Sequence, residues 1–471
     1  MILALGRRLA PISLLLAILP GAGLLAESAP SCDFFASPSG QGNGRSPEKP
    51  FRIERFWKEA TPGSTLCLLD GTYADAGSMV DPPATAPSGS GGRPITIRAL
   101  HDGKVLLDGR GQWHPLRLLR KDWYVVEGVN ACCSAATVVN LDHSNHNVIR
   151  RVAAWDAAEG NNEIFGVHFG EHNLLEDVAG WGIARKVFQS SQHGDFTTIR
   201  RAWGRWEGSH VIGPKMVYTL AYNNYGMLVE NAIGTWSGER MKETYVLNDY
   251  FGKPWVGRGE GTHTNYDVDQ PYAIFGVDAN KKDKQANARL LGSIAYVLAG
   301  DTYKPPRLVF FTNLDSVEIV DTLAYVEPGS HPDVHTFGLY GLAELTTALR
   351  ARNLTSIGGA GLLVRPQWET RNVLEGPSLS VYGDTGNAFN ATRGANLCRR
   401  YVDGVLTGEP LWPWPMNQRI IEATTRSGRA PVDVTATVEK LFGPMPKGCR
   451  AAPPEPESAP SPTPDTRSPG R

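Results

Sequence analysis

The sequence reads His146-Asn147-Val148-Ile149-Arg150-Arg151-Val152-Ala153-Ala154-Trp155 and repeats this pattern 26 residues later as His172-Asn173-Leu174-Leu175-Glu176-Asp177-Val178-Ala179-Gly180-Trp181. Looser copies follow at 198–203 and 228–233. Self-similarity at a fixed period of roughly 20 to 50 residues is typical of a solenoid, in which each unit buries its apolar face against its neighbours. Each copy is too short for two helices, and its short bursts of Val, Ile and Leu, cut by Gly, Asn and Asp, are typical of β-strands.

Strands that recur in the same sense, one coil apart, must pair in parallel. Without helices between them, the arrangement that fits is a chain wound into a parallel β-helix. A propeller or a sandwich with an accidental repeat is the alternative, but a propeller blade needs about 40 residues. The repeat therefore predicts an all-β fold, in which added coils extend one core rather than starting a new domain.

The first 26 residues have the features of a secretory signal peptide. Arg7 and Arg8 form a short basic region, an apolar run follows at 12–19, and small residues come after it. The run is too short and too interrupted by proline and glycine for a membrane span. The residues before Cys32, Ala29-Pro30-Ser31, match the pattern of a lipid anchor poorly. We therefore expect a secreted or periplasmic protein without a membrane span or a lipid anchor.

The formal net charge is -1 at pH 7, so no global field favours binding to nucleic acid or to an anionic membrane. We expect no nucleic-acid partner, and a monomer. The six cysteines fit an oxidising compartment, and their spacing does not resemble that of zinc ligands. From their positions we pair Cys32 with Cys67 and Cys398 with Cys449, and we leave the state of the adjacent Cys132 and Cys133 open.

The opening segment, 33–73, consists of a strand-like run, a helical pattern through Trp57 and Ala60, and the run Pro62-Gly63-Ser64-Thr65-Leu66-Cys67-Leu68-Leu69-Asp70-Gly71-Thr72-Tyr73. This order resembles the N-terminal end of secreted right-handed β-helix proteins of the pectate-lyase-like superfamily, in which a helix covers the open end of the coils. Residues 93–109 are similar to the first coils of that superfamily. The resemblance implies a single-stranded right-handed parallel β-helix with an N-terminal capping helix, and a polysaccharide as its partner.

These patterns divide the chain into four parts. We predict a signal peptide at 1–26, the parallel β-helix with its N-terminal cap at 27–410, a C-terminal helical cap at 411–450 and a disordered Pro-rich tail at 451–471. The C-terminal cap holds two short helical patterns, 417–425 and 433–442; Asp433 is a plausible N-cap for the second and Gly443 its stop. We expect these helices to pack along or under the last coils.

Four tryptophans lie at or near one repeat position. Equivalent residues on successive coils are about 4.8 Å apart, so a row of them can follow a chain of sugars. An exposed indole can stack on the apolar face of a sugar ring, and we therefore predict as substrate-binding Trp155, Trp181, Trp203 and Trp206. The alternative is that these rings cover coil junctions as packing, with their N–H groups hydrogen-bonded.

Basic residues form a second group near the same coils. β-Elimination on a uronic acid polymer needs a neutralised carboxylate and a base for the C5 proton, and in lyases of the superfamily that base is commonly Lys or Arg. A cluster of cations lowers the pKa of any one Lys among them. We predict Arg185 or Lys186 as base or carboxylate neutraliser, His193 as acid, and Arg205 and Lys215 as substrate clamps. At Arg150-Arg151 and Arg200-Arg201 we expect solvated positions paired with acidic residues of adjacent coils.

An acidic and histidine-containing group completes the candidates. We predict that Glu163 and His168 contact the substrate. Asp267 and Asp269, in a long loop, could hold calcium, which is the one cofactor that the sequence suggests without requiring it. Paired carboxylates could serve a glycoside hydrolase, but the sequence lacks the paired Asp signature of polygalacturonase-like hydrolases and the dense Asp cluster of calcium-dependent pectate lyases.

Together these patterns predict a secreted polysaccharide-active β-helix protein. The favoured activity is that of a lyase acting by β-elimination on an acidic, uronate-containing polysaccharide. A glycoside hydrolase on the same scaffold is one alternative, and a non-catalytic glycan-binding or surface-assembly protein is another.

Overall fold

The computed structural model describes residues 31–208, 216–221, 224–237, 244–248, 254–258, 273–277, 287–301, 307–311, 316–339, 348–364, 373–375, 379–382 and 396–450. The predicted signal peptide, 1–26, and the predicted tail, 451–471, lie outside these residues. From Cys32 onward the described residues belong to one compact unit. None of its described helices is long and apolar enough to cross a membrane.

Three parallel sheets make up the fold. The first sheet contains β1 (Phe34–Ala36), β2 (Thr65–Leu68), β4 (Ile95–Ala99), β7 (Tyr124–Glu127), β10 (Val148–Arg150), β13 (Leu174–Glu176), β16 (Thr198–Arg200), β19 (Met227–Glu230), β24 (Asn287–Leu291), β27 (Ser316–Val320), β30 (Ala348–Arg352) and β33 (Val373–Glu375). The second contains β3 (Gly71–Tyr73), β5 (Val105–Asp108), β8 (Val129–Cys132), β11 (Ala153–Trp155), β14 (Ala179–Ile183), β17 (Trp203–Gly208), β20 (Ile233–Trp236), β25 (Ile294–Val297), β28 (Leu323–Val326), β31 (Leu354–Ile357) and β34 (Leu379–Tyr382). The third contains β6 (Leu116–Leu119), β9 (Val139–Asp142), β12 (Glu163–His168), β15 (Lys186–Ser191), β18 (Met216–Ala221), β23 (Ala273–Val277), β26 (Arg307–Phe311), β29 (His335–Leu339) and β32 (Gly361–Val364).

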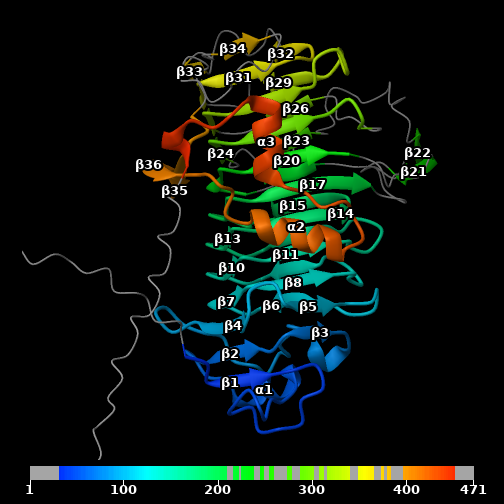
Figure 1. The fold of residues 1–471 in the computed structure, drawn as a ribbon, viewed down its shortest axis with the longest axis vertical. Helices are drawn as coiled ribbons and strands as arrows, with labels where there is room; N and C mark the ends of the chain where they lie inside the picture. Colours follow the sequence, from blue (N-terminus) through cyan, green and yellow to red (C-terminus); the bar gives the residue numbers. More distant parts are fainter. Residues whose placement is uncertain are drawn as a thin grey trace, which may run out of the picture. The chain divides into compact units, whose positions relative to one another are not determined.

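Successive coils contribute strands to these sheets in chain order, as Figure 1 shows from β1 in blue to β34 in yellow. The repeat seen in the sequence is the register of the coils: Val148 pairs with Leu174, and Trp155 pairs with Trp181. The predicted single-stranded right-handed parallel β-helix is therefore confirmed. Two antiparallel pairs stand outside the three sheets: β21 (Thr244–Asn248) with β22 (Pro254–Arg258), and β35 (Arg399–Val402) with β36 (Val405–Pro410).

A sharp turn joins the first sheet to the second in the coils that contain the sequence repeat. The residue after β10, Arg151, has a φ of 51°, and Asp177 and Arg201 take the same left-handed conformation one and two coils later. One residue in this region redirects the chain within a single step. Asn147, at the start of the repeat, links coils: its backbone N–H donates to the side chain of Asn173, 3.0 Å away, which satisfies a buried polar group.

The interior of the coils is filled by apolar side chains from all three sheets. Ile149, Leu175, Ile199 and Val229 occupy one register position on successive strands of the first sheet, and each is at most 1% exposed. In the third sheet, rings stack from coil to coil at 4.7 to 4.8 Å between centroids, in the order Phe165, Phe188, Tyr218 and Phe275. This spacing is that of the parallel strands themselves.

The N-terminal end is covered by α1 (Ile53–Glu59), as predicted. Its buried residues include Ile53 and Phe56, and the Phe56 ring meets that of Phe34 edge-on at 5.6 Å. The predicted Cys32–Cys67 and Cys398–Cys449 disulfides are confirmed, and the adjacent Cys132 and Cys133 are also bonded to each other.

Acidic partners hold the arginine pairs on the first sheet, as expected. Arg150 Nε lies 2.9 Å from a Glu176 oxygen, and Arg200 Nε lies 2.5 Å from Glu230 Oε1 in the next coils. Arg200 and Glu230 are buried rather than solvated, because the β35–β36 pair reaches them: the backbone N–H of Asp403 donates to Glu230 Oε1.

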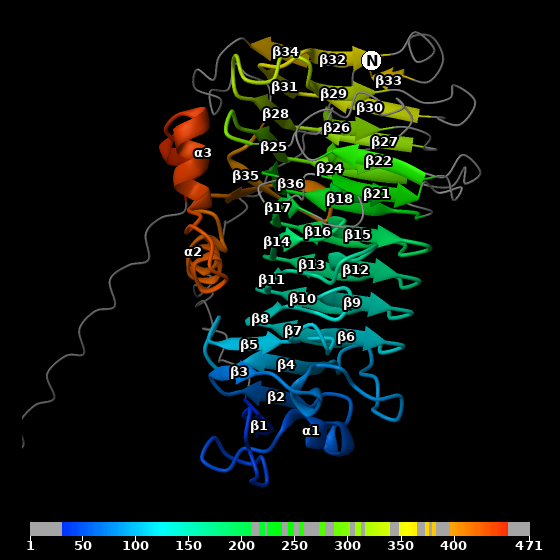
Figure 2. The same ribbon diagram turned by 90° about the vertical axis from the view of Figure 1, so that its right-hand side faces the viewer.

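Two C-terminal helices, α2 (Asn417–Arg426) and α3 (Val434–Phe442), lie beside the second sheet in Figures 1 and 2. Asp433 caps α3 by accepting a hydrogen bond from the N–H of Ala436, and α3 ends at Gly443, where φ is 89°. Both features were predicted. The cap stabilises the helix because the first N–H groups of a helix have no carbonyl partner within it, and the Asp433 side chain supplies one.

The position of α2 differs from the expectation. Arg419 of α2 is 5% exposed and lies 2.6 Å from Asp102, and it also donates to the carbonyl oxygens of Gly128 and Val129. These partners belong to early coils. α2 therefore packs over the early coils and not along the last ones, because its apolar residues cover the aromatic outer face of the second sheet.

Candidate functional site

The predicted tryptophan row lies under the C-terminal helices. Trp155, Trp181 and Trp203 are at most 3% exposed, and the Trp155 and Trp181 rings stack at 5.2 Å. They form one apolar cluster with residues of α2 and α3, and Trp181 Nε1 donates to Ser427 Oγ at 3.2 Å. These rings leave no open face for a sugar in this structure.

Trp206 is also buried, but within the coil interior. Its indole N–H donates to the carbonyl oxygen of Ala184 at 2.7 Å, and its ring lies 4.4 Å from that of Trp236. For all four tryptophans the structure thus favours packing, with hydrogen-bonded N–H groups at Trp181 and Trp206, over the predicted sugar-stacking role. Trp155, Trp181 and Trp203 fill the interface between the second sheet and the C-terminal helices. Trp206 fills space in the coil interior.

Arg205 lies on β17 of the second sheet, whereas the predicted residue Lys186 lies on β15 of the third sheet. Its guanidinium bonds Glu207 Oε1 at 2.5 Å, and Glu207 also bonds Arg429, which follows α2. Arg429 further contacts Asp156 at 2.7 Å. Arg205 therefore belongs to a charged group that ties the C-terminal segment to the coils, which does not favour its predicted role as a substrate clamp.

Glu163, His168 and Lys186 come together on the outer face of the third sheet. Glu163 of β12 pairs in register with Lys186 of β15. Lys186 Nζ lies 2.7 Å from Glu163 Oε1, and His168 Nε2 lies 3.5 Å from Glu163 Oε2. The side chains of Glu163 and Lys186 are each 4% exposed, whereas that of His168 is 21% exposed. His168 is thus the accessible member of this site, which we call the Glu163 cluster.

Gly166 keeps space clear inside the Glu163 cluster. It lies between Glu163 and His168 on β12, and a Cβ at this position would come within 2.9 Å of His168 Nε2 and 3.3 Å of Glu163 Oε2. Any other residue would therefore have to displace the imidazole or the carboxylate.

Burial and charge set the protonation of the two buried members. Burial alone would raise the pKa of Glu163, but the Lys186 ammonium and the nearby His168 together hold that pKa well below its ordinary value. Burial lowers the pKa of Lys186, and the nearby Arg185 lowers it further, against the opposing effect of Glu163. Glu163 is therefore an ionised carboxylate with a buried ammonium as its partner.

Three polar residues that sequence reasoning did not select complete the Glu163 cluster. Thr137 donates to Glu163 Oε2 at 2.7 Å, Ser191 Oγ lies 2.8 Å from His168 Nδ1, and Gln189 donates to Ser191 Oγ at 2.7 Å. The sequence shows that these residues are neighbours only after the coils are aligned. The spacing from Glu163 to Lys186 is 23 residues, whereas the visible repeat has a spacing of 26.

Next to the Glu163 cluster, one register position carries polar side chains on successive coils. Asn140, Gly166, Gln189 and Thr219 occupy this position on β9, β12, β15 and β18. Asn140 Oδ1, Gln189 Oε1 and Thr219 Oγ1 are buried atoms for which the described residues supply no hydrogen-bond partner. Such atoms are rare in proteins and require an explanation.

The remaining predicted residues lie nearby or outside the described residues. Arg185 donates to Asn161 Oδ1 at 2.9 Å. His193, in the turn after β15, is exposed and has its Nδ1 3.9 Å from Asp195. The predicted clamp Lys215 and the predicted calcium ligands Asp267 and Asp269 lie outside the described residues, so the calcium site stays a prediction.

Comparisons with known proteins give similarities in structure only. No family model matches the chain, and no curated protein matches its sequence. Among solved structures, the pectate lyase Pel9A is similar with 15% identity and a TM-score of 0.45, over 82% of this chain and 90% of that one. An alginate lyase from Paenibacillus sp. str. FPU-7 has 15% identity and a TM-score of 0.34, over 68% and 94% of the two chains. A rhamnogalacturonan lyase has 12% identity and a TM-score of 0.36, over 88% and 99%.

Proposed function

We propose that this protein cleaves an acidic, uronate-containing polysaccharide by β-elimination at the Glu163 cluster. The observation that carries the proposal is the contact of one accessible imidazole, His168, with a buried carboxylate that is itself neutralised by a buried ammonium. The Glu163 carboxylate, held by Lys186, lies beside the imidazole before substrate binds. Preorganised charge of this kind is usually the largest contribution to enzymatic rate.

His168 serves as the base in this proposal. In the tautomer with the proton on Nδ1, His168 donates to Ser191 Oγ and presents Nε2 as the acceptor. Glu163, 3.5 Å from Nε2, stabilises the imidazolium that forms when the proton arrives. Histidine is the side chain that most often serves as a general base in enzymes. The earlier assignment of Arg185 or Lys186 as the base fits less well, because Lys186 is almost fully buried and bonded to Glu163.

Arg185 supplies positive charge for the substrate carboxylate, since the charge of Lys186 is already paired with that of Glu163. A neutralised C6 carboxylate makes the C5 proton more acidic, because the negative charge that develops on removal of the proton is stabilised. In the polar row beside the Glu163 cluster, Gln189 and Thr219 lie one coil apart, about 4.8 Å. Asn140 lies two coils before Gln189, because Gly166 occupies the position between them.

The reaction balances without water. The base removes the C5 proton, the C–H electrons form the C4–C5 double bond, and the C4–O bond to the leaving sugar breaks. The leaving oxygen accepts a proton, for which His193 is the predicted donor. One product carries a new reducing end, and the other carries an unsaturated uronate.

Ultraviolet absorbance tests this proposal directly. The mature chain is incubated with a panel of uronate-containing and neutral polysaccharides, first with calcium and then with a chelator. We expect growth of the unsaturated-uronate absorbance on one acidic polymer. New reducing ends without this absorbance would indicate the hydrolase alternative, and no product from any polymer, with binding retained, would indicate the glycan-binding alternative. Either result would overturn the proposal.

Variants locate the activity at the Glu163 cluster. His168→Gln should lower kcat/KM roughly 10²- to 10⁴-fold, which is the usual contribution of general acid–base catalysis. His143→Gln is the matched control, since His143 is a more exposed histidine that bonds Asp142 and stacks on Phe169. Gly166→Ala should also reduce activity, because its Cβ would crowd Nε2. Wild-type turnover in a folded His168→Gln variant would exclude this site.

A further inference from the structure

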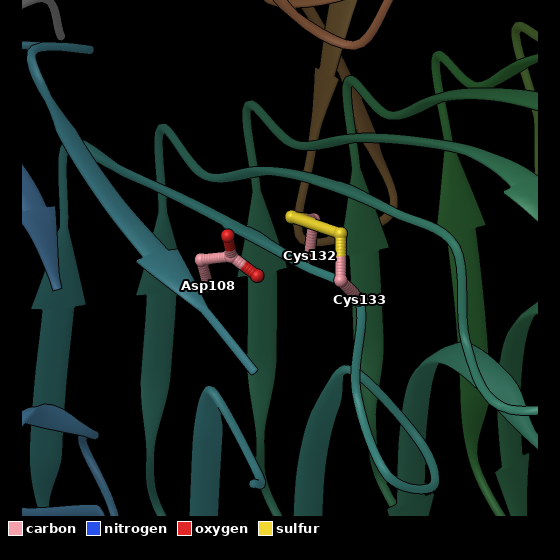
Figure 3. A group of neighbouring side chains, drawn as sticks. All are labelled: Asp108, Cys132 and Cys133. Atoms are coloured by element: carbon pink, nitrogen blue, oxygen red, sulfur yellow. A yellow bond between two sulfur atoms is a disulfide. The ribbon is translucent and has the colours of Figure 1, made fainter. Parts of the chain in front are cut away.

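The adjacent residues Cys132 and Cys133 are joined by a disulfide at the end of β8. The proposed reaction does not use this bond. Asp108 of the preceding coil pairs in register with Cys132. Figure 3 shows its carboxylate facing the two sulfur atoms, and the ligand atoms of the three residues lie within 4.8 Å of one another.

We propose that Asp108, Cys132 and Cys133 bind a thiophilic divalent cation, of the zinc type, when the disulfide is reduced. Zinc contacts thiolate sulfur at roughly 2.3 Å and carboxylate oxygen at roughly 2.0–2.2 Å, so two of its ligands in a tetrahedral site lie roughly 3.5–3.8 Å apart. The ligand atoms of the three side chains lie within 4.8 Å of one another, so side-chain rotation after reduction can bring them to this spacing. This inference is independent of the proposed lyase activity.

The backbone around the pair is fixed on both sides. The N–H of Gly109 donates to the carbonyl oxygen of Cys132 at 2.9 Å, and that of Gly111 donates to the carbonyl oxygen of Cys133 at 2.6 Å. The N–H of Cys133 donates in turn to Trp155, one coil further, at 3.2 Å. Opening the disulfide therefore moves the two sulfur atoms without releasing the strands that carry them.

Of the three disulfides, this one has the shortest separation of its Cα atoms. The single peptide link holds the two Cα atoms 3.7 Å apart, below the usual range of roughly 4.4–6.8 Å, and such bridges are more easily reduced. Each of the three bridges has one half-buried cysteine, namely Cys133, Cys32 or Cys398, so burial does not distinguish them. The short separation of the Cα atoms is what favours reduction of the Cys132–Cys133 bridge.

The reduction and the binding step balance as follows. A thiolate of a dithiol reductant attacks one sulfur of the pair, and its second thiol resolves the mixed disulfide. The reductant becomes a disulfide, and Cys132 and Cys133 together gain two electrons and two protons. The cation then displaces the thiol protons, since thiolates are the binding form.

The Asp108 carboxylate is already held in place by a backbone hydrogen bond. One oxygen of its carboxylate accepts the N–H of Arg110 at 2.9 Å, and we assign the other oxygen as the ligand. Two thiolates and one carboxylate form a set of three protein ligands, and water can fill a fourth, tetrahedral position.

Cobalt(II) is the probe for this site, because its thiolate complexes have a charge-transfer absorbance in the near ultraviolet that zinc lacks. The full mature chain is reduced with a phosphine, freed of reductant without oxygen, and titrated with cobalt(II), then with zinc. We expect one cobalt per chain, displaced by zinc, in the reduced protein and none in the oxidised protein. Mass spectrometry after alkylation counts the thiols that have opened.

Two variants make the outcome specific. In Cys132→Ser/Cys133→Ser the other two bridges remain, so cobalt binding that persists there would place the metal elsewhere and overturn the proposal. Asp108→Asn should weaken cobalt binding roughly 10- to 100-fold, and unchanged affinity would remove Asp108 from the site. Absence of the charge-transfer band in reduced wild-type protein, or a Cys132–Cys133 bridge that stays closed in excess phosphine, would equally overturn it.

Discussion

Glu163 and Lys186 hold the same register position on neighbouring coils, and their carboxylate and ammonium meet at 2.7 Å with both side chains almost fully buried. Charges are rarely buried unless they are paired. A buried pair stabilises a fold little compared with apolar residues of the same size. Its presence on the outer face of the third sheet, beside the accessible His168, is therefore better explained by the chemistry of the site than by stability.

Removing one partner of this pair should be costly. Glu163→Gln leaves the Lys186 ammonium buried without a counter-charge and should lower the free energy of unfolding by about 3–5 kcal/mol. The double variant Glu163→Gln/Lys186→Met should recover much of this loss, because no unpaired charge remains. Urea unfolding measures both, with the exposed Glu171→Gln as control. A Glu163→Gln variant as stable as the control would mean that the pair is not buried.

The contribution of Glu163 should depend on pH. Its folded pKa is lowered by Lys186 and His168, so the stabilisation is present above the unfolded pKa, about 4.3, and is lost as the pH falls toward the folded pKa. The difference in unfolding free energy between wild type and Glu163→Gln should be level from pH 7 to about 5 and shrink below about 4. Urea titrations at a series of pH values measure this difference. A gap that widens on acidification would indicate a raised pKa instead.

The tryptophan row should matter for stability and not for sugar binding. Trp181→Ala removes a fully buried ring between β14 and α2 and should lower the free energy of unfolding by about 3–5 kcal/mol. Trp113→Ala, at a ring that is 37% exposed, should change it by less than about 0.5 kcal/mol. Thermal melting and affinity electrophoresis in polysaccharide gels report the two properties. Loss of glycan binding in a folded Trp181→Ala protein would contradict this prediction and support a role of Trp181 in sugar stacking.

Arg419 should fasten the C-terminal helices to the early coils. Arg419→Ala leaves Asp102 and two carbonyl oxygens without this donor and should lower the free energy of unfolding by about 2–3 kcal/mol. Limited proteolysis should then cut between β36 and α2 sooner than in wild type. Arg426→Ala, at an exposed position of the same helix, is the control. Equal cleavage rates in the two variants would contradict this role.

The parts of the fold that repeat could be predicted from the sequence. The 26-residue offset between Asn147 and Asn173 is the register itself, and local signals such as the Asp433 cap are encoded within a few residues. The covering of the second sheet could not be predicted in the same way. Trp181 meets Ser427 across 246 residues, and no periodicity links an apolar helix face to one of three available sheets.

The Glu163 cluster was recognised only in pieces. Glu163, His168 and Lys186 were each selected from the sequence, but in different groups, because strands of the third sheet follow loops of unequal length. Only the register joins Glu163 to Lys186 and places Ser191 beside His168. Arg205 was grouped with Lys186 from closeness in sequence, although the turn between the second and third sheets directs the two side chains to different faces.

The C-terminal segment changes how such a stack can assemble. Coils that touch only their neighbours can form one after another as the chain is made. The pairing of Arg419 with Asp102 spans 317 residues, and contacts over such distances form late because a long loop must close first. The outer face of the early coils, which contains Trp155, Trp181 and Trp203, therefore stays uncovered until residues 411–450 have been synthesised and have folded back onto it. Docking of this segment is the closing step of assembly, and a chain that ends before it carries an apolar surface available for aggregation.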